Sequence, residues 1–195
     1  MQLRDMVREG TSLAEIGAYL DSLTHGRRLE EMYTLGGKEQ AKLYDMADGQ
    51  GGKLVPDYIP QGKAPLTEVI HWGHNSLPVF TRFQKRFALA PQAKGPQICT
   101  GYNEQTMKVF TGPGYFTAKE AELDGKLRVV VDYYDVPTVK CPTWPPIKPN
   151  SDRLGRFIYF EMRDWMWRVS KHMTIGRAKK RDHWMDNWFL LCRED

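Results

Sequence analysis

The chain has 195 residues and a mass of 22.6 kDa, which is enough for one domain with a substantial core. Hydrophobic residues make up 41% of it, aromatic residues 12% and charged residues 27%. This composition excludes a disordered chain. The apolar runs of the sequence are far shorter than the roughly 18 residues of a membrane-spanning helix. The N-terminal residues are charged and lack the apolar stretch of a secretory signal, so we expect a cytoplasmic protein without membrane association.

The three cysteines, Cys99, Cys141 and Cys192, lie far apart and form no Cys-x-x-Cys pair. Their spacing argues against a disulfide framework and against a structural zinc site. Dinucleotide, Walker, serine-hydrolase and metalloprotease motifs do not occur in the sequence. We therefore expect no cofactor and no metal.

A net charge of +4 is modest for a protein that binds nucleic acid. The densest basic cluster, Arg177 to Arg181, falls where we expect a hairpin turn. We interpret it as a solvated loop tip and predict no nucleic-acid partner. The oligomeric state stays open, with a homodimer among the alternatives.

Residues 1–48 are predicted to form a helical segment. Ser12 and Glu15 make a capping box, and Leu13, Ile16, Leu20 and Leu23 follow on one helical face. A second helix should begin near Arg27 or after Gly36-Gly37. Residues 49–65, rich in glycine and proline, are interpreted as a surface linker.

From residue 66 to 195 the apolar pattern alternates with period two, which predicts a domain of about eight antiparallel strands, arranged as a closed barrel or a sandwich. Asp124-Gly125 and residues 180–182 are predicted hairpin turns, and residues 162–169 a short helix. Trp144 should hold the proline-rich loop 137–149 against the body. The expected strands cover residues 69–72, 79–87, 98–102, 106–110, 115–122, 127–133, 154–160, 173–178 and 184–192.

The C-terminal third resembles the lipocalin-like family of bacterial and fungal proteins known by its G-x-W-x-G motif. The resemblance lies in residues 157–159, 162–169, 174–177 and 188–195, with residues 43–45 and 83–87 in the same order upstream. The motif itself is absent, and His71-Trp72-Gly73 is its nearest counterpart, with a different order. The resemblance implies a lipocalin-like barrel of about eight strands with a helical segment before it, hence a mainly β, α+β fold.

His71 and His74 are the most conspicuous polar pair. On a helix their spacing would place both imidazoles on one face, as a metal site requires, whereas on a strand it sends them to opposite faces. The β-rich context favours the strand, with one histidine as a general base or a hydrogen-bonded pocket residue.

Asp132 and Asp186 are the other candidate acid/base residues. Asp132 lies in the strongest predicted strand and points into the barrel only if the face of Val129 and Val131 packs outward. Otherwise it is a surface acid. Asp186 alternates with Trp184 and Trp188, which suits either a polar anchor in an aromatic cavity or a structural hydrogen bond.

Seven aromatic residues on predicted strands could line a ligand cavity or simply fill the core: Trp72, Tyr102, Phe116, Tyr133, Tyr159, Trp184 and Trp188. An eight-stranded barrel leaves room for one small ligand. The leading hypothesis is therefore a protein that binds a hydrophobic or aromatic small molecule. The alternatives are a cofactor-independent isomerase, cyclase or lyase using His71, His74, Asp132 and Asp186, and an interaction protein whose helices dock a partner.

Overall fold

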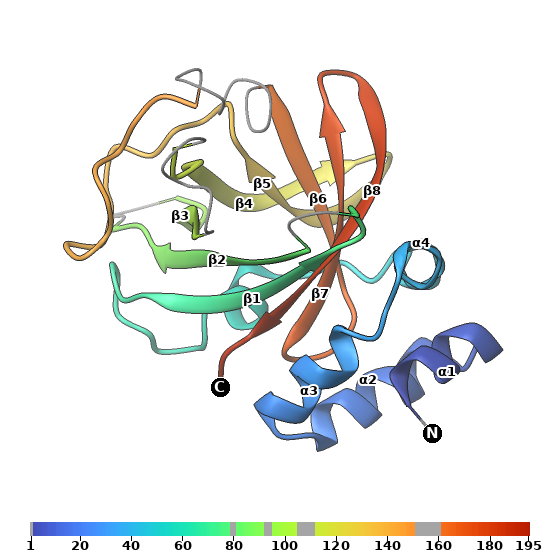
Figure 1. Cartoon of the computed structure of the whole chain (residues 1–195). Helices are drawn as coiled ribbons and strands as arrows, with labels where there is room; N and C mark the ends of the chain where they lie inside the picture. The colour runs from blue at the N-terminus through green and yellow to red at the C-terminus, as the bar shows by residue number, and fades with distance from the viewer. Residues whose placement is uncertain (1, 79–80, 92–94, 105–111, 151–160) are drawn as a thin grey trace.

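Eight antiparallel strands close into a barrel in the computed structural model, which describes residues 2–78, 81–91, 95–104, 112–150 and 161–195 (Figure 1). Strands adjacent in sequence are adjacent in space, and the last pairs with the first. The predicted fold class, a mainly β barrel with helices before it, is confirmed. The strands are β1 (Val69–Asn75), β2 (Arg82–Leu89), β3 (Ile98–Glu104), β4 (Phe116–Leu123), β5 (Lys126–Asp132), β6 (Met162–Arg168), β7 (Met173–Lys180) and β8 (His183–Arg193).

Four helices precede the barrel: α1 (Leu3–Glu9), α2 (Leu13–Ser22), α3 (His25–Met32) and α4 (Gly37–Met46). The predicted capping box of Ser12 and Glu15 starts α2. Apolar side chains of the helices, such as Leu20 and Leu43, share a buried cluster with Ile175 and Leu190 of the barrel wall. The helices therefore cover the outside of β7 and β8, at the lower right of Figure 1. None of the described helices is long and apolar enough to span a membrane.

The segment after α4 closes one end of the barrel. A short kinked turn, η1 (Leu54–Tyr58), inserts Leu54 and Tyr58 into the interior cluster, and Ile59 is 1% exposed. The prediction of a surface linker over residues 49–65 is therefore wrong for this part. The glycines that suggested a linker lie on either side of η1, and Pro56 lies within it.

A second prediction is wrong at residues 162–169, which form strand β6 and not a helix. Trp165, Met166 and Trp167 are all buried, although they alternate between the two faces of the strand. An outer face covered by helices and loops is apolar as well, so the alternation that marks a strand disappears from the sequence. The predicted strands at 106–110 and 154–160 lie outside the described residues.

Trp144 holds the proline-rich loop as predicted. Its ring is 4% exposed and lies 5.1 Å, centroid to centroid, from the ring of Tyr102. Its indole N–H donates to Glu68 over 2.6 Å. The loop is thereby fixed to the outer face of β3 without any backbone ladder.

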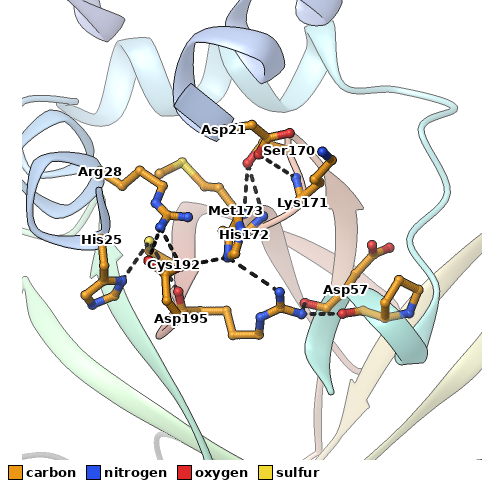
Figure 2. A network of polar contacts seen from close by, with 12 residues as sticks. Asp21, His25, Arg28, Asp57, Ser170, Lys171, His172, Met173, Cys192 and Asp195 are labelled. Carbon is orange, nitrogen blue, oxygen red and sulfur yellow. Dashed lines mark hydrogen bonds and ion pairs between the residues drawn. The ribbon is translucent and has the colours of Figure 1, made fainter. Parts of the chain in front are cut away.

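A polar network ties the helices to the closed end of the barrel (Figure 2). Arg28 of α3, 2% exposed, donates to both carboxylate oxygens of Asp195, at 2.5 and 2.6 Å. His172 Nδ1 lies 3.1 Å from the same carboxylate. Arg193 donates to the backbone oxygens of Pro56 and Asp57, so the end of β8 also holds η1 in place.

Asp195→Asn tests this network. The substitution leaves the buried Arg28 guanidinium with a neutral partner, so we expect a loss of about 1–2 kcal/mol in unfolding free energy, measured by chemical denaturation. Asp45→Asn, on the exposed face of α4, is the matched control and should change little. Equal stability of both variants would show that the network contributes nothing measurable.

Asp124-Gly125 is the two-residue turn between β4 and β5, as predicted, and both residues have positive φ, 54° and 72°. Gly125→Val places a β-branched residue in this left-handed conformation, so we expect a loss of about 1–2 kcal/mol by chemical denaturation. Asp124→Asn is the control, because asparagine tolerates the same conformation, and its effect should stay within about 0.5 kcal/mol. A Gly125→Val protein of unchanged stability would contradict the turn geometry.

Candidate functional site

Four polar side chains converge inside the barrel, near the end opposite η1. The ammonium of Lys85 on β2 donates to Asn103 over 3.0 Å, to Asp164 over 3.1 Å and to the hydroxyl of Tyr133. All four residues are at most 3% exposed. We call Lys85, Asn103, Tyr133 and Asp164 the polar centre.

Aromatic rings surround the ammonium of Lys85. Its Nζ lies 5.0 to 5.7 Å from the ring centroids of Phe83, Phe116, Tyr133 and Phe189. Burial lowers the pKa of Lys85, and the carboxylate of Asp164 opposes that shift. The polar centre is thus an ion pair held in an aromatic cage, with one cation and one anion.

Three glycines on the inner face make room for the cage. A Cβ on Gly73 would lie 2.5 Å from the ring of Phe83, one on Gly101 2.3 Å from Phe116, and one on Gly176 2.6 Å from Phe189. The outer edge of each ring therefore lies against a glycine of a neighbouring strand. The middle of the barrel is filled by these rings, so space for a ligand lies toward the mouth.

A pocket of about 380 Å³ occupies that mouth, between β6, β7 and β8. Met162 and Ala178 form its inner wall, and Ala178 is the register partner of Asp164. The floor of the pocket therefore adjoins the polar centre. The remaining lining residues are Leu77, Lys180, Met185, Asp186 and Asn187, and the surface that the lining exposes to the pocket is largely apolar.

A bulge in β8 shapes this pocket. The register shifts between Arg177 and Lys179, which pair with Trp188 and Trp184, so three residues of β8, 185–187, lie opposite the single residue Ala178 of β7. Arg177 holds the bulge from outside by donating to the backbone oxygen of Met185 over 2.8 Å and to Asp186 over 3.0 Å. Bulges of this kind often redirect side chains beside functional sites.

A larger hollow, of about 670 Å³, lies outside the barrel between α2 and the turn after β6. The charged groups in this hollow connect segments of the chain. Arg168 lies 3.5 Å from the carboxylate of Asp57, and the backbone N–H of Lys171 donates to Asp21. Since Gln50, Arg168 and Lys171 in this hollow are exposed, whereas the polar side chains inside the barrel are buried, we place the candidate site at the mouth.

His71 belongs to the closed end. It lies on the inner face, 1% exposed, with Nε2 at 2.9 Å from the backbone oxygen of Tyr58 and its ring stacked on that tyrosine. Burial lowers the pKa of His71 to about 3. Within the part of the chain that the structure describes, its Nδ1 is buried without a hydrogen-bond partner. His71 is therefore a neutral imidazole in the contact with η1.

The other predicted acid/base residues do not join His71. His74 points out of the barrel, to the backbone oxygen of Leu35 at 3.0 Å, which confirms that the two histidines lie on opposite faces. Asp132 is also on the outer face and pairs with Arg163 at 2.9 Å, so the interpretation that it points inward is wrong. Asp186 lines the rim of the mouth but is exposed and bound to Arg177, so a buried anchor between two tryptophans is wrong too.

Of the seven predicted cavity aromatics, Phe116 and Tyr133 lie inside the barrel. Trp72 and Trp188 pack against the helix cluster, and Trp184 faces outward beside Lys179 and Arg177. Tyr102 packs outside with Trp144. Tyr159 lies outside the described residues. Trp72, Trp188 and Tyr102 are accommodated on the outer face because helices and loops cover that face.

Sequence reasoning missed Lys85, Asn103 and Asp164. A signal was present: Lys85 stands between Phe83 and Phe87, and Asp164 between Met162 and Met166, each two residues away. On a strand these are positions of one face, so each charge shares its face with large apolar neighbours. A charged residue between apolar residues on one face of a strand, together with an opposite charge placed in the same way on a second strand, predicts a buried ion pair.

The comparisons with known proteins give no match: no family model, no curated protein and no solved structure is significantly similar to the chain.

His71 predicts a pH dependence of stability. The pKa of His71 is depressed in the folded protein. Below about pH 6.5 the imidazole is therefore protonated in the unfolded chain but stays neutral in the folded protein. The free energy of unfolding should therefore decrease as the pH is lowered, and His71 should account for a decrease of about 2 kcal/mol from about pH 7 to about pH 5. Chemical denaturation at several pH values measures this slope.

His71→Gln should remove this share of the slope, while His183→Gln, at the exposed tip of the last hairpin, should leave it intact. His74 and His172 also have lowered pKa values from burial, so a shallower slope remains in the His71 variant. An unchanged slope in His71→Gln would contradict the buried, neutral imidazole.

Proposed function

We propose that the barrel binds a flat hydrophobic or aromatic small molecule in its mouth pocket, with a polar group of the ligand directed to the polar centre. The observation that carries the proposal is the position of Lys85 and Asp164. The pair is buried beside the floor of a largely apolar pocket, toward the end of the barrel opposite η1. Apolar walls with a few fixed polar groups are the usual composition of a small-molecule site.

Energetics support a role for the polar centre beyond folding. A buried ion pair contributes little net stability, because desolvation of both charges offsets their attraction. Well-packed apolar residues at Lys85 and Asp164 would keep the barrel at least as stable. The pair therefore suits recognition better than folding, and the resemblance to lipocalin-like proteins fits this proposal.

Acid/base catalysis in the same place is the second candidate. Burial lowers the pKa of Lys85, so its amine can exchange a proton nearer neutral pH than an exposed lysine. Asp164 and the hydroxyl of Tyr133 are its immediate proton partners. An isomerase, cyclase or lyase without a cofactor would use these three groups, in place of the histidines and aspartates expected from the sequence.

Titration with prodan, a flat naphthalene ketone whose emission moves to the blue in apolar surroundings, tests the binding proposal. We expect saturable binding with one site. Lys85→Met combined with Asp164→Asn removes both charges together and avoids an unpaired buried charge. This double variant should bind at least about tenfold more weakly, since one hydrogen bond to a charged group is lost.

Lys119→Met on the outer face of β4 is the matched control and should bind prodan like the wild type. Ala178→Leu would fill the pocket floor and should also weaken binding. Absence of saturable binding, or equal affinity in wild type, double variant and Ala178→Leu, would reject the mouth as a ligand site.

A further inference from the structure

We infer that Lys85 captures the carbonyl group of a hydrophobic aldehyde as a covalent imine, with Asp164 as proton carrier and counter-ion. This inference rests on the proposed function, because the same mouth pocket must hold the body of the aldehyde. It adds the chemical class of the ligand and a reaction at a named atom.

The surroundings of Lys85 Nζ suit imine chemistry at each stage. Its hydrogen-bond partners are one carboxylate, one amide oxygen and one phenolic hydroxyl, all fixed by burial. The carboxylate of Asp164 at 3.1 Å is close enough to accept the ammonium proton, which frees the amine lone pair. Burial lowers the pKa of Lys85 and so assists this transfer.

The aromatic cage around Lys85 stabilises the protonated imine that the reaction forms. A protonated imine carries the same single positive charge as the ammonium that it replaces. Ring faces about 5–6 Å from a cation stabilise it without offering a nucleophile, and the rings of Phe83, Phe116 and Phe189 lie at 5.7, 5.2 and 5.3 Å from Nζ. They also exclude water, which would hydrolyse the imine.

The proton balance closes without any further reactant. The ammonium of Lys85 gives a proton to Asp164, and the free amine attacks the carbonyl carbon, so that a C–N bond forms and the carbonyl π electrons move to oxygen. That oxygen takes the proton from Asp164. The nitrogen then gives a second proton to Asp164, which passes it to the hydroxyl. The C–O bond breaks, water leaves, and the nitrogen lone pair forms the C=N bond of a cationic imine beside the carboxylate.

Position favours Lys85 over the other lysines for this reaction. The exposed lysines keep hydrated ammonium groups, which are weak nucleophiles near neutral pH. Among the lysines that the structure describes, Lys85 is the one that is buried. Its partner Asp164 is the register partner of Ala178, a small residue of the pocket wall, so the pocket adjoins the pair.

Borohydride trapping tests the inference. The protein is incubated with naphthaldehyde and sodium borohydride, which reduces an imine to a stable secondary amine. Intact mass spectrometry should show one adduct per chain, with the mass of the aldehyde less one oxygen atom, and peptide mapping should place it on Lys85. Asp164→Asn should form this adduct at least about tenfold more slowly, because the proton carrier is lost.

Lys85→Arg keeps the positive charge but cannot form an imine, so the adduct should disappear, while Lys119→Arg should keep it. If Lys85→Arg fails to fold, the peptide map of the wild type decides alone. Adducts spread over several surface lysines, or none on Lys85, would overturn the inference.

Naphthalenemethanol separates this inference from the proposed function, because the alcohol has the same ring system and no carbonyl. If the alcohol displaces prodan but the aldehyde leaves Lys85 unlabelled, the site binds small molecules without imine chemistry and the inference fails alone. If neither compound displaces prodan and Lys85 stays unlabelled, both proposals fail.

Discussion

The cost of keeping a lysine ammonium out of water determines how the interior of this barrel is organised. A buried charge needs a counter-charge and hydrogen-bond acceptors, and Lys85 has a carboxylate, an amide oxygen and a hydroxyl around one nitrogen. These partners come from β3, the end of β5 and β6, so the ion pair connects strands on different sides of the barrel. The rings that complete the cage need glycines beneath them, which explains Gly73, Gly101 and Gly176 in otherwise regular strands.

The two ends of the barrel have different tasks. One end is closed by η1, fixed by His71, Arg193 and the network of Arg28 and Asp195, and the helices cover the wall beside it. The other end holds the β8 bulge and the mouth pocket. The contacts that hold η1 lie at the closed end, whereas the charged groups of the polar centre lie toward the mouth.

The sequence predicts the frame of the fold well and the site poorly, for physical reasons. The capping box at Ser12, the turn at Asp124-Gly125 and the last hairpin follow from local chemistry that acts within a few residues. Residues 162–169 and 54–58 were misinterpreted because burial there depends on distant elements, namely helices over the outer wall and an open barrel end to fill. Asp132 and the tryptophans could not be assigned to a face, since both faces of this barrel are covered over much of its surface.

The polar centre illustrates the same limit and shows how far pattern can go. Lys85 and Asp164 stand 79 positions apart, and only barrel closure brings β2 opposite β6. What the sequence does contain is the mismatch of each charge with its own face, Phe83 and Phe87 on one strand and Met162 and Met166 on the other. Opposite charges in two apolar rows of one closed barrel can satisfy each other only inside it. Such rows therefore predict both a buried pair and the strands that must meet across the interior, which a search for histidines and catalytic motifs does not find.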